Sequence, residues 1–434
     1  MVRLVPPLGL LLCIASSVAQ TAPPPVAGAT DAGIGKEQRL AGWREDLAFL
    51  ASELPARHKN AFFKCSKSDF EAAVAALERD LPALQDHQIV VRMMQLLALL
   101  GDFHTGIGAQ ALPAPPRALP IAFTLFADGP VIVAARDAQR DLIGCTLVQF
   151  GGTPIDGALR RAASVAGYEN ESTFKSIAPR QLVNGQIAHA LGLAPAPDRA
   201  TITVRDGKGG ERPIERPMER TVELVALAPG EKLTVGGPER DRLPLYRQQR
   251  STQNWFELLG DQRAVYFHYW TCADEREKRV ADVGEDVLAA IDDNDVQRVI
   301  VDLRGNGGGN SALLMPFIQR LASRKNVNRP GGIIVLVGRG TFSSAHLNAV
   351  SLRTDLHAVL IGESTGQKPN AYGEVKTFAL PHSRIEVRYS TKFWKTEDGD
   401  RPSMEPDVTI VPTSADFFAG RDPVLEAALA YQAK

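Results

Sequence analysis

The second half of the chain alternates short apolar runs with helical stretches, and this alternation constrains the fold more than any other feature of the sequence. The runs that predict strands are 264–269, 298–303, 332–337 and 358–361. The stretches that predict helices between them are 280–291, 311–321 and one that begins at Ser343. Repeated strand–helix units favour a parallel sheet covered by helices, in which ligands gather at the carboxyl ends of the strands. The sequence therefore predicts an α/β layer with a site at that edge.

The residues before this layer predict a helical cap over 37–115. Apolar side chains recur at three- and four-residue steps over 40–54, which is typical of one face of a helix. A second helix is predicted to begin at Ser68, because Ser68 and Glu71 have the spacing of a capping box. The apolar run from residue 89, which ends at a glycine, predicts a third helix.

Residues 116–225 have the pattern of a β-rich module. Apolar runs at 121–126 and 131–135 flank Asp128-Gly129, which is a hairpin signal. A later run at 200–204 alternates apolar and polar residues, and a polar helical stretch precedes it. The sequence therefore predicts strands interrupted by a helical insertion, with the last domain occupying 226–434.

Charge balance and the N-terminus restrict the class of protein. The chain has 49 Lys+Arg against 50 Asp+Glu, so no basic surplus indicates binding of nucleic acid. A positive charge, a short apolar run and small residues before position 20 predict a cleaved signal peptide over 1–19, followed by a flexible linker over 20–36. A membrane-anchoring helix is the alternative, but the run is short and contains Pro6 and Pro7. We expect an exported protein, periplasmic or secreted, without stable membrane insertion.

The turn after the strand 298–303 is rich in glycine. Arg304-Gly-Asn-Gly-Gly-Gly-Asn310 lacks the third glycine of a dinucleotide-binding fingerprint and the Gly-Lys-Ser/Thr of a P-loop. One interpretation is a tight turn that needs positive φ. The functional interpretation is that the backbone N–H groups of Gly307 and Gly308 form an oxyanion hole, facing a negative charge that develops during a reaction.

Ser343 lies where the next strand turns into a helix, in Gly340-Thr-Phe-Ser-Ser-Ala345. At a helix N-terminus, the free N–H groups and the helix dipole stabilise negative charge on or beside a hydroxyl oxygen. Serine is also a preferred N-cap, which is the better interpretation of this segment in isolation. The Gly-x-Ser-x-Gly elbow of α/β-hydrolases is not matched, because Phe342 precedes and Ala345 follows.

Lys368 follows the strand 358–361, within Gly362-Glu-Ser-Thr-Gly-Gln-Lys-Pro-Asn370. A lysine at a strand end that loses its charge by burial can act as a general base. The alternative is a solvated surface lysine, and its neighbours have the composition of a loop.

Together these segments resemble the tail-specific, or C-terminal processing, serine protease family and its relatives, the tricorn protease and the interphotoreceptor retinoid-binding repeats. The resemblance is carried by the segments Val301-Asp-Leu-Arg-Gly-Asn-Gly-Gly-Gly309, Thr341-Phe-Ser-Ser-Ala345, Gly362-Glu363 and Pro406-Asp407, and more weakly by Gly151-Gly-Thr-Pro154. It implies a catalytic domain of the ββα-repeat (ClpP/crotonase-like) type and a PDZ-like module at 116–225. It also implies a dyad of Ser343 with Lys368, which follows it by 25 residues, and oxyanion donors from Ser344 and the Gly307–Gly308 turn.

A histidine competes with Lys368 for the role of base. Gly101-Asp-Phe-His-Thr105 is similar to the Asp-x-His-Thr segment of the tricorn-like branch, which pairs serine with histidine. His104 needs no large pKa shift to act near neutral pH, whereas a lysine does. In that branch an acidic residue assists the histidine; Asp400 and Glu405 are the candidates. His346 stands where the family commonly has glutamate.

The sequence thus predicts a serine endopeptidase that acts on peptides or unfolded proteins through an acyl-enzyme on Ser343. No His-Glu-x-x-His occurs, and Cys65, Cys145 and Cys272 lack metal-ligand spacing, so no metal or cofactor is expected. We expect the three cysteines to be buried thiols; the alternative is one disulfide between two of them. The other functions left open are a non-catalytic ligand- or peptide-binding protein on the same fold and a small-molecule esterase.

Overall fold

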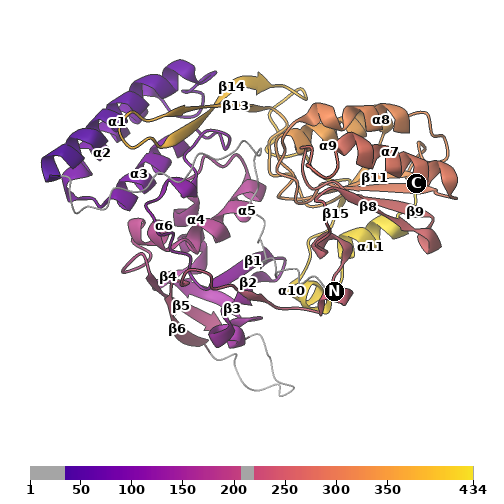
Figure 1. Ribbon diagram of the computed structural model, residues 1–434, viewed down its shortest axis with the longest axis horizontal. Coiled ribbons are helices and arrows are strands. Elements are labelled where there is room, and N and C mark those ends of the chain that lie inside the picture. The colour runs from indigo at the N-terminus through magenta and orange to yellow at the C-terminus, as the bar shows by residue number, and fades with distance from the viewer. Residues whose placement is uncertain (1–34, 207–218, 434) are drawn as a thin grey trace, which may run out of the picture.

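The computed structural model describes residues 35–206 and 219–433 (Figure 1). The predicted signal peptide, 1–19, and all but the end of the predicted linker, 20–36, lie outside these residues. The described part combines helices with a seven-stranded sheet, a six-stranded sheet and a two-stranded hairpin. No helix in it is long and apolar enough to cross a membrane.

The N-terminal helices are α1 (Lys36–Arg57), α2 (Lys67–Asp80) and α3 (Asp86–Ala98). Their apolar faces pack together, with Leu50 and Leu54 fully buried. The second helix begins at Lys67, one residue before the predicted start at Ser68, and its N-cap is Ser66. The Ser66 side chain accepts the backbone N–H of Asp69, so the capping interaction has the predicted spacing at a different pair of residues.

The seven-stranded sheet is antiparallel and contains the predicted hairpin, β1 (Ile121–Phe126) and β2 (Gly129–Ala135). Its main path runs β1-β2-β3-β5-β6, with β4 on β3 and β7 on β2. The other strands are β3 (Thr146–Phe150), β4 (Thr153–Pro154), β5 (Arg199–Arg205), β6 (Glu219–Val225) and β7 (Thr234–Val235). The predicted helical insertion lies between β4 and β5 and consists of α4 (Ile155–Ala163), α5 (Glu171–Leu182) and α6 (Gly185–Ala190).

The predicted α/β layer is a six-stranded sheet of order β15-β12-β11-β10-β9-β8, parallel except for β8 against β9. Its strands are β8 (Trp255–Leu259), β9 (Ala264–His268), β10 (Arg298–Asp302), β11 (Ile333–Val337), β12 (Val359–Gly362) and β15 (Val408–Thr409). Its helices are α7 (Val280–Asp293), α8 (Met315–Leu321), α9 (Ser344–Leu356), α10 (Ser414–Ala419) and α11 (Pro423–Ala430).

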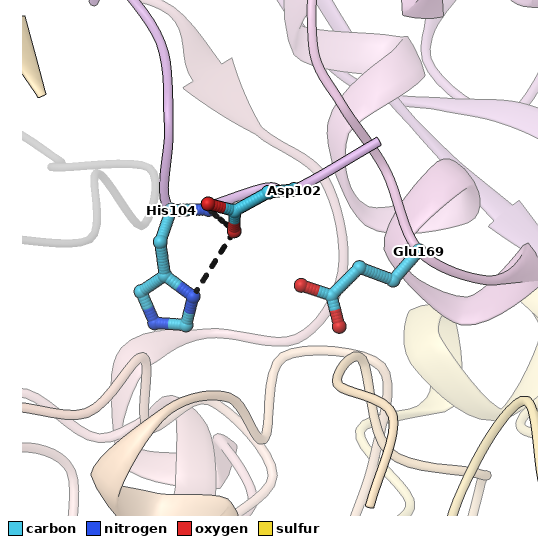
Figure 2. Close-up of side chains that lie close together, drawn as sticks. All are labelled: Asp102, His104 and Glu169. Atoms are coloured by element: carbon cyan, nitrogen blue, oxygen red, sulfur yellow. Dashed lines mark hydrogen bonds and ion pairs between the residues drawn. The ribbon is translucent and has the colours of Figure 1, made fainter. Parts of the chain in front are cut away.

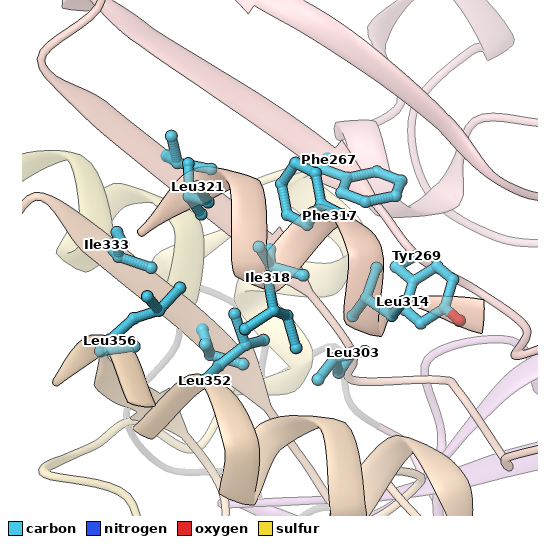
Figure 3. Packing of buried hydrophobic residues seen from close by; sticks show 14 of the residues in the cluster. Phe267, Tyr269, Leu303, Leu314, Phe317, Ile318, Leu321, Ile333, Leu352 and Leu356 are labelled. Carbon is cyan, nitrogen blue, oxygen red and sulfur yellow. The ribbon is translucent and has the colours of Figure 1, made fainter. Parts of the chain in front are cut away.

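Both faces of this sheet are buried, which explains its continuous apolar strands. In β10 the side chains of Val299 and Val301 belong to the core on the face covered by α7, α8 and α9. Figure 3 shows other members of this core, among them Phe317 and Leu352. Ile300, between the two valines in sequence, packs on the opposite face against α11. Because the strands are parallel, their carboxyl ends meet at one edge, and the Gly-rich turn and Ser343 both follow such ends.

The hairpin of β13 (Ala371–Ala379) and β14 (Glu386–Trp394) packs away from the six-stranded sheet. Figure 1 shows it beside α1, and Phe378, Val387 and Tyr389 share a core with the N-terminal helices. The helical cap is therefore joined to a segment that follows Lys368 closely in sequence. Among the cysteines, Cys145 and Cys272 are buried as predicted, whereas Cys65 is partly exposed.

Candidate active site

Ser343 occupies a sharp turn between β11 and α9. Its backbone has φ 53° and ψ −127°, a positive φ that is unusual for a residue with a side chain. The side chain makes no capping hydrogen bond to the helix, so the interpretation of Ser343 as a simple N-cap is not supported. A strained strand-to-helix turn that presents a hydroxyl is the local geometry of a nucleophile, although the Gly-x-Ser-x-Gly motif is absent.

The partner of the Ser343 hydroxyl is His104, which lies in the loop after α3. Its Nε2 lies 3.0 Å from Ser343 Oγ, a hydrogen-bonding distance across 239 residues of sequence. The ring packs on Phe342 with 4.6 Å between centroids, and only 9% of the residue is exposed. Burial lowers the pKa of His104, helped by the charge of Arg388 and opposed by that of Asp102. The imidazole therefore stays neutral at neutral pH, as a proton acceptor must.

Asp102 fixes the loop that carries His104. Its Oδ1 accepts the backbone N–H of His104 at 2.9 Å, and its Oδ2 accepts the Thr105 and Ser390 hydroxyls at 2.5 and 2.6 Å. Ser390 belongs to β14, so the hairpin on the cap holds this loop in place. Burial alone would raise the pKa of Asp102, but its hydrogen bonds and the charge of His104 lower it to about 2. Asp102 is consequently an ionised carboxylate throughout the working pH range.

His58 adds a further donor to Asp102. Its Nε2 lies 3.1 Å from Asp102 Oδ2, and its Nδ1 accepts the backbone N–H of Asn60 at 3.0 Å. Because Nδ1 is used as an acceptor, the proton resides on Nε2 and points at the carboxylate. The end of α1 therefore contributes to the geometry around His104, a role that no local sequence motif indicated.

Lys368 does not meet Ser343 in this structure. Its Nζ forms an ion pair with Asp400 Oδ1 at 2.5 Å, and Asp400 is 78% exposed in its side chain. Glu405 accepts the hydroxyl of Ser364. Of the two bases predicted for Ser343, Lys368 is ion-paired with Asp400, whereas His104 lies within hydrogen-bonding distance of the hydroxyl. Neither acidic residue weighed as a helper of the histidine is bound to it.

The glycine-rich turn lies directly against Ser343. Gly308 has φ 109°, and a Cβ added to it would come within 2.6 Å of Ser343 Cβ. The N–H of Gly308 donates to Asn306 Oδ1 at 2.9 Å, while Gly307 is exposed beside it. Ser344 belongs to the first turn of α9, whose N–H groups have no acceptor inside the helix, and its hydroxyl donates to Gly309 O at 2.6 Å. Gly308 and Ser344 therefore lie next to Ser343, but the N–H of Gly308 is already hydrogen-bonded to the Asn306 side chain.

Gln367 was not anticipated as part of the site. Its side-chain Oε1 accepts the backbone N–H of Ser343 at 2.8 Å, and the residue is almost fully buried. His346, where the family commonly has glutamate, is buried in α9 and contacts the hydroxyl of Thr365 at 3.2 Å. Burial lowers the pKa of His346 to about 4, so it is a neutral packing residue.

One group of side chains has the spacing of metal ligands. Asp102, His104 and Glu169 offer atoms that lie within 4.8 Å of one another (Figure 2). The Asp102 oxygens already accept protein donors, and His104 Nε2 faces Ser343. His104 Nδ1 and one oxygen of Glu169 remain, which is fewer than the three or four protein ligands that a typical zinc site uses.

No family model and no curated protein sequence matches the chain. Solved structures do match. A mutant of CPAF covers 90% of this chain and 96% of its own, with 14% identity and a TM-score of 0.63; mature CPAF does so with 15% identity and 0.60. The photosystem II D1 C-terminal processing protease covers 90% of this chain and 99% of its own at 15% identity, with a TM-score of 0.38. At these identities the likeness shows the fold alone, and at that level the chain shares its architecture with CPAF, in line with the resemblance to tail-specific proteases.

Proposed function

We propose that this protein is a serine endopeptidase that hydrolyses peptide bonds of unfolded proteins through an acyl-enzyme on Ser343. The observation that carries the proposal is the 3.0 Å contact between Ser343 Oγ and the Nε2 of the buried, neutral His104. A hydroxyl beside a neutral imidazole, on a strained turn at a helix N-terminus, is the arrangement needed to activate a serine.

In the proposed reaction, Ser343 Oγ attacks the carbonyl carbon of the scissile bond and its proton passes to His104 Nε2. The carbonyl oxygen becomes an oxyanion, which we assign to the N–H groups of Ser344 and the Gly307–Gly308 turn. Collapse breaks the C–N bond, and the departing amine takes the proton from His104. Water then attacks the ester, losing a proton to His104; the C–O bond breaks, the acid leaves, and His104 returns its proton to Ser343 Oγ. The Gly308 N–H joins the oxyanion hole only if it leaves Asn306 Oδ1.

We propose that the six-stranded layer is of the ββα-repeat type and that residues 116–225 form a PDZ-like module that guides peptides to it. Contacts between this region and the catalytic loops support the idea. Asn170, the N-cap of α5, donates to the carbonyl oxygen of Thr365 at 3.1 Å, and the Thr173 hydroxyl contacts Gly366 O. Binding at the module can thus reach the loop that carries Gln367. We further propose that the protein acts after export, as residues 1–19 predict.

The reactivity of Ser343 is tested by labelling with a fluorophosphonate, followed by peptide mapping. We expect one adduct, on Ser343, in folded wild-type protein and none in protein unfolded in guanidinium chloride, because activation depends on His104. Absence of an adduct on Ser343 in the folded protein would contradict the proposal and favour a non-catalytic binding protein. Parallel rates on peptide and ester substrates test the peptidase against an esterase.

A further inference from the structure

Glu169 is a largely buried carboxylic acid next to the proposed catalytic histidine. It precedes the N-cap of α5, and Figure 2 shows its carboxyl group extending toward His104 and Asp102. Its Oε2 accepts the backbone N–H of Lys368 at 3.2 Å. Its Oε1 has no hydrogen-bond partner among the described residues, and the same is true of His104 Nδ1. Two buried polar atoms without partners thus belong to neighbouring groups whose ligand atoms lie within 4.8 Å.

A histidine that accepts a proton at Nε2 must carry a proton at Nδ1, and a buried N–H needs an acceptor. Asp102 is the nearer residue in sequence, but its Oδ1 is 3.8 Å from Nδ1, which is too long for a hydrogen bond. Its oxygens also accept donors from His58, Thr105, Ser390 and the His104 backbone. Glu169 Oε1 has no such commitment, but it is not hydrogen-bonded to Nδ1 in this structure and reaches it only by a small movement of the side chain, in competition with the backbone of Tyr372.

We propose that Glu169 is the positioning residue of this site: its ionised carboxylate accepts the Nδ1–H of His104 and thereby holds the tautomer in which Nε2 takes the proton of Ser343. Its effect on turnover rests on the proposed peptidase function. Its effect on the protonation of His104 does not. The group comes from the helical insertion of the β-rich module, so this module completes the proposed catalytic site.

The two carboxyl groups beside His104 have opposite environments. Burial, together with the charge of Asp102, raises the pKa of Glu169 to about 8, against the N–H groups of Lys368 and Phe103. Asp102, by contrast, stays ionised. Two neighbouring carboxyl groups whose pKa values are shifted in opposite directions usually have different roles in a site. The charged and titratable groups that face the pair from the surrounding elements are His58, Asp102, Lys368, Tyr372, Arg388 and, behind Lys368, Asp400.

The expected pH dependence follows from the sign of this shift. Below about pH 8, protonated Glu169 is a neutral acid that accepts the Nδ1–H only weakly and does not stabilise a positive charge on His104; above it, the charged carboxylate does both. A pocket of about 220 Å³ lined by Asp102, Glu169, Lys368 and Tyr372 gives solvent protons access to this carboxyl group. The acidic limb of kcat/KM is therefore expected near pH 8.

The test compares Glu169→Gln with Glu169→Asp and with Glu171→Gln, an exposed control two residues away. We expect Glu169→Gln to lower kcat by about 10²-fold or more with little change in KM, and to move the acidic limb below 6.5 because only His104 remains to titrate. Glu169→Asp should restore part of kcat, and Glu171→Gln should match wild type. Unchanged kcat and an unchanged acidic limb in Glu169→Gln would overturn the proposal.

A second measurement does not need turnover. In protein with ¹⁵N-labelled histidine, the His104 resonance, identified by its loss in His104→Gln, should show a titration step near pH 8 in wild type that is missing in Glu169→Gln. If peptides are not hydrolysed but this step behaves as expected, Glu169 is linked to His104 and only the peptidase function fails. A step that persists in Glu169→Gln would show that another group, and not Glu169, is coupled to His104.

Discussion

Replacing His104 by alanine is expected to lower kcat for an unfolded protein substrate by about 10³- to 10⁴-fold. The hydroxyl of Ser343 would lose the acceptor that lies 3.0 Å away, and the departing amine would lose its proton donor. The measurement is single-turnover hydrolysis of a fluorescently labelled, reduced and unfolded protein at pH 8.5, above the pKa of about 8 to which burial raises Glu169.

Lys368→Ala is the matched comparison, since spacing alone favours the lysine as base. Its ammonium group pairs with an exposed carboxylate and not with Ser343. We expect a far smaller loss of kcat than in His104→Ala, about threefold to tenfold, because the charge of Lys368 only helps to keep Glu169 ionised. Loss of turnover in Lys368→Ala, with His104→Ala still active, would contradict the histidine as base and restore the lysine dyad.

The second large effect concerns the stability of the layer beneath the site. Arg304 follows β10 and donates to Asp302 at 2.6 Å and to Asp422 at 2.7 Å. Asp302 is 3% exposed and Asp422 is 7% exposed, and both are ion-paired with this one guanidinium. Asp422 is also the N-cap of α11, which covers one face of the sheet. Arg304→Met would leave two buried carboxylates without a counter-charge, keeping only hydrogen bonds such as those from Tyr266 and the Leu425 backbone, and is expected to lower the free energy of unfolding by about 3–5 kcal/mol.

Urea unfolding followed by circular dichroism measures this loss. Arg320→Met is the control, because Arg320 pairs with Glu285 at the surface and both side chains are about half exposed. It should change the free energy of unfolding by no more than about 1 kcal/mol. Equal effects of the two substitutions would show that the network around Arg304 does not hold the end of β10.

The strands and helices of the α/β layer could be predicted because burial on both faces leaves a continuous apolar run in each strand. The hairpin of β13 and β14 could not be placed in the same way. Its partners, such as Leu50 of α1, lie more than 300 residues earlier, and nothing in its own alternation indicates them. The start of α2 was misplaced because Ser66 and Ser68 offer the same capping chemistry within one turn.

The part of the proposed site that follows directly after strands could be predicted from the sequence. Ser343 and the Gly-rich turn meet because their strands, β11 and β10, are parallel neighbours. Side-chain direction was not predictable for Lys368, since it depends on an ion pair with Asp400. The residues around His104 were missed for a related reason. His58, Glu169 and Ser390 come from three separate parts of the chain and carry no local signature.

The central claim is that Ser343 forms a bond to the substrate, and hydrolysis of an unfolded protein by wild type and Ser343→Ala at pH 8.5 tests it most directly. With folding of the variant verified by its urea unfolding midpoint, the account predicts that the rate falls by about 10⁴-fold or more. Hydrolysis by Ser343→Ala within tenfold of the wild-type rate would contradict it.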